Sequence, residues 1–189
     1  MTAIEQDKSN LKAKKFMMWL FLISSIMLFA GLTSAFIVYS AAPGKGLKVI
    51  LPQAFMYSSA VILLSSVTMF LANSAGKKLQ FQKQQLYTGL TIALGVIFFA
   101  LQYYGWVVLT REGATFVNYN ASHTFIYVFT GFHLLHIFAG LMMLLRCLFG
   151  RWKNIPQVRN LHRLEMTSIF WHFIDILWIY LYVFLLLNQ

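Results

Sequence analysis

Residues 164–187, LEMTSIFWHFIDILWIYLYVFLLL, form the last long apolar run of the chain. A helix rises about 1.5 Å per residue, so this apolar run is long enough to cross a hydrocarbon core of roughly 30 Å. The run nevertheless contains Glu165, His172 and Asp175. Each ionisable side chain in hydrocarbon costs about 2.5–3.5 kcal/mol on insertion scales. We therefore expect a transmembrane helix whose polar residues have a partner or a function.

Four other apolar runs are equally long, and they cover about 16–40, 53–75, 86–110 and 121–149. Hydrophobic residues make up 59% of the chain and charged residues 11%, which excludes an ordinary soluble domain. The runs lack the strict alternation of a membrane β-barrel. The sequence therefore predicts an all-α, polytopic membrane helix bundle with five transmembrane helices, formed by a single domain over 16–189 after a cytoplasmic tail over 1–15.

Lysines and arginines are distributed unequally between the two ends of the predicted bundle. Twelve fall on the side of the N-terminus, and only Lys45, Lys48 and Arg111 fall on the other side. The positive-inside rule then places the N-terminus in the cytoplasm and the C-terminus outside. The net charge of +10 is thus interpreted as a topology signal, and no nucleic-acid partner is expected.

Four ionisable residues are expected at a shared depth in the membrane: His133 and His136 on one face of the fourth helix, and His172 and Asp175 on the fifth. Three interpretations compete. The histidines could hold a metal or haem, they could relay protons together with Asp175, or the four residues could form a structural polar cluster that joins the two helices. We favour the structural cluster, with a buried histidine paired to Asp175, and predict no catalytic, cofactor-binding or metal-binding residue in this chain.

Other polar and aromatic residues near the predicted fifth helix are candidates for lipid or interface contacts. The basic groups among them suit a lipid phosphate. The candidates are Arg159, His162, Arg163, Glu165, Trp171 and Trp178. Small residues in the helices predict close helix–helix contact. They include Gly31, Gly131 and Gly140.

Two motifs resemble those of subunit III of haem–copper oxidases, the cytochrome c oxidase family. Residues 130–137, TGFHLLHI, are similar to the family's "TGFHxxHV" segment, and Glu165 followed by 171–178, WHFIDILW, is similar to its last-helix signature. Weaker resemblance covers most of the chain, which is similar to the five-helix bacterial form.

The resemblance implies a non-catalytic chain in a complex that is an enzyme, a respiratory terminal oxidase of the bacterial inner membrane. It implies that haem and copper are held by partner subunits I and II, and that this chain binds phospholipid, stabilises the catalytic subunit and supports proton uptake. The complex would reduce oxygen to water and pump protons. A subunit of a quinol oxidase or nitric oxide reductase, a haem-binding membrane anchor, and membership of a respiratory supercomplex stay open.

Two positions depart from the family's pattern. The family often has glutamate where this chain has Ser25 in the first helix, and again where it has Gly105 in the third. A role for buried carboxylates at these positions therefore cannot be transferred to this chain.

Overall fold

The computed structural model describes residues 3–43, 51–117, 121–149 and 157–188, and the side chains of 3–10 and 157–159 lie outside the described part. Five helices account for nearly all of it: α1 (Ala3–Ser40), α2 (Gln53–Lys77), α3 (Phe81–Arg111), α4 (Ala121–Phe149) and α5 (Gln157–Leu187). Each contains a segment long and apolar enough to cross a membrane. No strand occurs in the described ranges. The predicted all-α, five-span fold is confirmed.

Four of the five helices are longer than the apolar runs that predict them. α4 has the expected bounds, while α1 begins at Ala3, α3 at Phe81 and α5 at Gln157. The first apolar span begins at Leu11, so the expected N-terminal tail is in large part the polar beginning of α1. The additional turns are polar because a helix needs hydrocarbon-compatible residues only where it crosses the hydrocarbon core.

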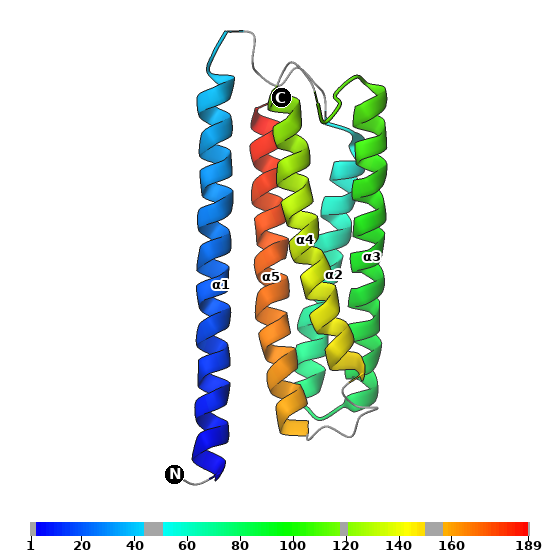
Figure 1. Ribbon diagram of the computed structural model, residues 1–189. Helices are drawn as coiled ribbons and strands as arrows, with labels where there is room; N and C mark the ends of the chain where they lie inside the picture. Colours follow the sequence, from blue (N-terminus) through cyan, green and yellow to red (C-terminus); the bar gives the residue numbers. More distant parts are fainter. Residues whose placement is uncertain (1–2, 44–50, 118–120, 150–156, 189) are drawn as a thin grey trace.

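α2, α3, α4 and α5 form a four-helix group, and α1 stands beside it (Figure 1). Within the described part, α1 packs against α4 and α5 and not against α2 or α3. α1 begins at one end of the bundle, and α5 ends at the opposite end (Figure 1). The five spans therefore alternate in direction, as short connections require.

The indole of Trp171 lies at the centre of the four-helix group. Its side chain is fully buried, and two glycines lie against it. A Cβ atom added at Gly95 of α3 would lie 3.0 Å from the indole, and one added at Gly140 of α4 would lie 3.0 Å from it as well. The absence of side chains at these two positions makes room for the large ring, so the indole of α5 reaches both α3 and α4.

The expectation that small residues mark helix contacts is only partly confirmed. Gly140 supports the packing of Trp171, whereas a Cβ atom added at Gly31 or Gly131 would meet nothing within 4 Å. These two glycines face outward from the chain. A small residue can therefore mark either a close helix contact or an open depression, and the sequence does not distinguish the two.

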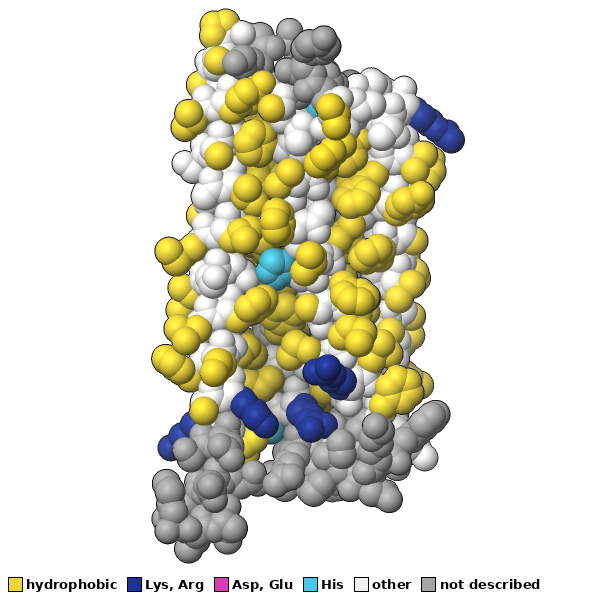
Figure 2. Space-filling model, viewed as in Figure 1, with side chains coloured by type: hydrophobic (Ala, Val, Ile, Leu, Met, Phe, Trp, Pro, Cys, Tyr) yellow, Lys and Arg dark blue, Asp and Glu magenta, His cyan; other side chains and the backbone are white. Residues whose placement is uncertain are grey.

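Basic side chains gather at one end of the molecule. Figure 2 shows most of the visible lysine and arginine side chains near the end where α1 begins, and hydrophobic side chains over the middle of the molecule. Arg111 lies in the last turn of α3, at the opposite end. This distribution agrees with the charge asymmetry of the sequence, since the basic residues of α2, α3 and α4 near that end include Lys77, Lys83 and Arg146.

We expect Gly95→Val to destabilise the bundle by about 1–3 kcal/mol, because the added methyl groups would overpack a site where Cβ alone meets Leu141 at 2.9 Å. Gly89→Val in the same helix is the matched control, since a Cβ atom there meets nothing within 4 Å. Thermal unfolding of both variants in detergent, followed by circular dichroism, measures the difference. Equal melting temperatures would contradict the proposed fit of Trp171.

Candidate functional site

Serine hydroxyls of α2 accept hydrogen bonds from the aromatic residues of α5. The Nε1–H of Trp171 donates to Oγ of Ser65 at 3.0 Å, and that of Trp178 donates to Oγ of Ser59 at 3.0 Å. Both indoles are fully buried. Trp171 and Trp178, two of the residues predicted as lipid or interface candidates, are therefore interior residues of this chain.

His172 follows the same pattern one residue along α5. Its Nδ1 lies 2.7 Å from Oγ of Ser66 in α2, and the side chain is half-buried. The partner of His172 is therefore a hydroxyl group of α2 and not a residue of α4. The sequence contains the signal for this contact, because pairs of serines recur two turns apart in α2, at 58–59 and 65–66.

His136 faces α1. Its Nδ1 lies 2.7 Å from the carbonyl oxygen of Phe132, and its Nε2 lies 3.1 Å from Oγ of Ser25. A carbonyl can only accept, so Nδ1 carries the proton in the neutral ring. The Ser25 hydroxyl has one proton and lies within hydrogen-bond distance of both Nε2 and the carbonyl oxygen of Phe21, at 2.9 Å from the latter. Phe21 and Phe29 of α1 lie on either side, with ring centroids 5.8 and 5.6 Å from the imidazole. This serine occupies the first position where the family often has glutamate.

His133 faces the interior of the four-helix group. Its ring centroid lies 5.1 Å from that of Trp178 and 5.8 Å from that of Phe98. The side chain is fully buried, and neither ring nitrogen has a hydrogen-bond partner among the described residues. His133 and His136 were expected on one face, but they contact different neighbours, because one faces the bundle interior and the other α1.

Asp175 is 2% exposed, and neither carboxyl oxygen has a hydrogen-bond partner among the described residues. The Ser66 hydroxyl lies near this carboxyl group, but the two groups do not meet the distance and angle of a hydrogen bond. A direct hydrogen bond between Asp175 and a histidine, which the sequence led us to expect, is absent from the described part of the chain. The four predicted residues thus lie at neighbouring depths without forming one bonded cluster.

A metal site would need more ligands than this arrangement brings together. The described residues contain no group of three or more histidine, cysteine, aspartate and glutamate side chains placed to hold a metal ion. His136 and His172 instead each lie within hydrogen-bond distance of a serine.

The predicted lipid-contact residues near the beginning of α5 are only partly described. His162 and Glu165 are partly buried and Arg163 is exposed, while the side chain of Arg159 lies outside the described residues. Nε2 of His162 is buried without a hydrogen-bond partner in the described part. Their role in binding lipid phosphate stays a prediction.

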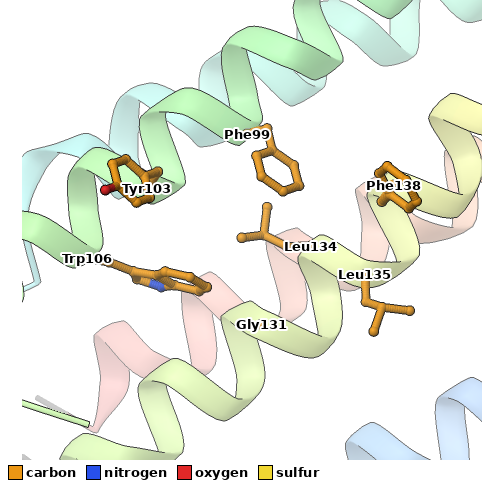
Figure 3. Close-up of a pocket in the computed structure, with 7 residues that line it drawn as sticks. All are labelled: Phe99, Tyr103, Trp106, Gly131, Leu134, Leu135 and Phe138. Carbon is orange, nitrogen blue, oxygen red and sulfur yellow. The ribbon is translucent and has the colours of Figure 1, made fainter.

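A groove between α3 and α4 was not expected from the sequence. It has a cavity volume of about 320 Å³, and Figure 3 shows the aromatic and leucine side chains around it. Its lining residues are Phe99, Tyr103, Trp106, Gly131, Leu134, Leu135 and Phe138. The Nε1–H of Trp106 already donates to Oγ1 of Thr130 at 2.9 Å. The groove therefore offers an apolar surface. Its wall carries no side chain at Gly131, where an added Cβ atom would meet nothing within 4 Å.

Gly105, the second position where the family often has glutamate, is in close contact with α2. A Cβ atom added there would lie 3.0 Å from Cε2 of Phe55, and Phe55 is buried and stacked on Trp178 at 6.0 Å between ring centroids. A longer side chain at Gly105 would displace this aromatic pair.

Together these features define a class of protein: a multi-pass helical membrane protein whose interior polar groups mainly join its own helices. Comparison with known proteins gives the family. The family model for cytochrome c oxidase subunit III matches residues 5–188.

Individual relatives agree with this match. Cytochrome c oxidase subunit 3 of Bacillus sp. (strain PS3) is 29% identical over 87% of this chain and 80% of its own length. The corresponding subunit of Synechocystis sp. is 31% identical over 87% of this chain and 71% of its own length. Cytochrome bo(3) ubiquinol oxidase subunit 3 of Pseudomonas aeruginosa is 30% identical over 85% and 78%.

The chain belongs to the cytochrome c oxidase subunit III family. Members of this family assemble with the other subunits of a haem–copper oxidase, an oxidoreductase complex, and this chain is a non-catalytic subunit of such a complex. The resemblance recognised in the two sequence motifs is confirmed.

We expect Ser25→Ala to destabilise the attachment of α1 by about 1–3 kcal/mol, because it leaves the buried Nε2 of His136 without a partner. The neighbouring Ser24→Ala is the control, since Ser24 is exposed and surface substitutions change stability by about 0.5 kcal/mol or less. Thermal unfolding of the two variants compares them. If both substitutions lowered the melting temperature by the same small amount, the Ser25–His136 contact would contribute nothing measurable to stability.

Proposed function

We propose that this chain is the accessory subunit III of a bacterial respiratory terminal oxidase, and that it binds beside subunits I and II, which hold the haem and copper. The observation that carries the proposal is the family match over 5–188, which includes all five spans. In this role the chain stabilises the catalytic subunit and supports its proton uptake. The complex reduces oxygen to water and pumps protons.

The proposed membrane is the bacterial inner membrane, with the beginning of α1 in the cytoplasm and the end of α5 outside. The charge distribution supports this orientation, because the described basic side chains lie mainly at the end where α1 begins (Figure 2). The polar first turns of α1 then lie among the cytoplasmic headgroups, where Lys12, Lys14 and Lys15 are attracted to anionic lipids.

The polar residues inside the bundle have a structural role in this proposal. His136 joins α4 to α1, and His172 joins α5 to α2. Hydrogen bonds between transmembrane helices contribute about 0.6–2 kcal/mol each. Several such bonds keep the bundle in one arrangement, which a subunit needs if it is to present a constant surface to a catalytic partner.

Phospholipid is the second proposed partner, and the groove between α3 and α4 is a place where an acyl chain fits. The lining is apolar and faces outward from the chain. It extends over eight residues of each helix, roughly 10 Å. An acyl chain in this groove would supply van der Waals contacts that the lining side chains do not find within the protein. Arg163 and His162, near the beginning of α5, are the proposed contacts for lipid phosphate on the cytoplasmic side.

Purification tests the main proposal. We expect a tagged chain, purified from its host membrane in mild detergent, to bring down haem–copper subunits, and the preparation to show haem absorption and oxygen consumption. Assays with reduced cytochrome c and with quinol identify the electron donor, since relatives of both oxidase types are similar to this chain. A preparation without a haem–copper subunit would overturn the proposal, and a haem spectrum from the isolated chain would favour a haem-binding anchor.

A filled groove tests the lipid proposal. We expect Gly131→Leu to reduce the phospholipid that remains with the purified protein by about one molecule per chain, as counted by native mass spectrometry, because the new side chain would occupy the groove. Gly31→Leu in α1 is the matched control, since it also adds a side chain where a Cβ atom meets nothing within 4 Å. Equal lipid counts in the wild type and both variants would refute an acyl chain at this groove.

A further inference from the structure

Three buried side chains of the four-helix group leave five polar atoms without a hydrogen-bond partner among the described residues. The atoms are Nδ1 and Nε2 of His133, Oδ1 and Oδ2 of Asp175, and Oε1 of Gln102. The exposed fractions of these side chains are 0%, 2% and 1%. Each unsatisfied buried group costs about 1–3 kcal/mol, and most buried polar atoms in native proteins have a protein or water partner.

The three side chains belong to one region of the interior. His133 lies on α4 and Asp175 on α5, two helices that pack together, and each lies roughly 18 Å from the same end of the bundle at 1.5 Å per residue. Trp178, one turn from Asp175, is within 5.1 Å of His133 between ring centroids. The two side chains therefore approach the same part of the interior from adjacent helices.

Gln102 connects to this region through α2 and α3. Its amide nitrogen donates to Oγ of Ser58 at 2.9 Å, next to the serine that accepts from Trp178. Phe98, one turn before Gln102 on α3, packs against both His133 and Trp178. The amide nitrogen is thus fixed by Ser58, and Oε1 is left as a free acceptor.

Protein groups alone leave this set unsatisfied. The Ser66 hydroxyl has a single proton and already lies 2.7 Å from His172, so it can serve at most one of the two oxygens of Asp175. A neutral imidazole offers one donor and one acceptor, while a carboxylate and an amide oxygen accept. Water both donates and accepts, and a buried water makes on average about three hydrogen bonds.

We propose that the interior of the α2–α3–α4–α5 group is a binding site for internal water, with His133, Asp175 and Oε1 of Gln102 as its ligands. The water joins α4 to α5 at mid-membrane depth, where the sequence alone suggested a direct histidine–aspartate pair. It also supplies hydrogen bonds to a carboxyl group that has no basic partner among the described residues. The inference concerns the interior of this chain and does not depend on which oxidase the chain serves.

A structure of the full chain, together with the subunits that copurify with it, tests the site directly. In lipid nanodiscs at a resolution that reveals ordered water, we expect density within hydrogen-bond distance of His133 and Asp175. A direct bond between these two side chains, or an interior without such density, would overturn the proposal.

A double-mutant cycle gives an independent measurement. The double variant His133→Leu/Asp175→Leu is compared with the two single variants. If one water network links the two residues, the melting-temperature shift of the double variant differs from the sum of the two single shifts. Asp175→Leu combined with Ser25→Ala is the control pair, because Ser25 bonds to His136 on the side of α1, and we expect its shifts to add.

Asp175→Asn keeps an oxygen that can bind water and serves as the conservative variant. We expect it to retain most of the melting temperature that Asp175→Leu loses. If the leucine variant does not accumulate, the cycle is run with Asp175→Val and His133→Phe, which also remove the groups that bind water. Additive shifts in the tested pair, or equal losses for the asparagine and leucine variants, would exclude the network.

Discussion

The hydrogen bonds from α5 to the serines of α2 hold the two helices in one register. An indole N–H in hydrocarbon needs an acceptor inside the protein, and Trp171 and Trp178 find theirs in Ser65 and Ser59. As the residue number rises along α5, it falls along α2, so the two bonds define an antiparallel register. A shift of α5 by one turn would remove both acceptors. It would also move the Trp171 ring away from the two glycines that leave room for it.

This register of α5 determines the positions of the neighbouring helices. With Trp171 fixed by Ser65, its ring reaches the two places where α3 and α4 carry Gly95 and Gly140. α1 is attached to the outside of the group by aromatic packing of Phe36 against Phe129 and Phe184, and by polar contacts. The Oγ1 atom of Thr33 lies 3.0 Å from the hydroxyl of Tyr180, and Ser25 bonds to His136. α1 therefore depends for its position on α4 and α5, and among the described residues it makes no packing contact with α2 or α3.

The five spans could be predicted from the sequence because hydropathy and length are sufficient to recognise a transmembrane helix. The neighbour that each polar residue contacts could not be predicted in the same way. His133 and His136 are three positions apart, which corresponds to a rotation of about 60° at 3.6 residues per turn. In α4 that rotation separates the bundle interior from α1, so the outcome depends on where the other helices pack. The groove was missed for a similar reason. In the sequence, a glycine such as Gly131 is equally compatible with a close helix contact and with the lining of an open groove.

The two departures from the family's pattern are also changes of packing and not only of charge. The space beside Gly105 is filled by Phe55, whose ring lies 3.0 Å from the position of an added Cβ atom. Ser25 provides a neutral hydroxyl to His136, where a glutamate would bring a charge into contact with an imidazole. The chain has only five acidic residues, and Asp175 is the one that lies deep within a span, so a continuous series of carboxylates across the membrane cannot be formed. A contribution of this subunit to proton movement would therefore have to involve Asp175 together with histidines or water, and not a row of carboxylates.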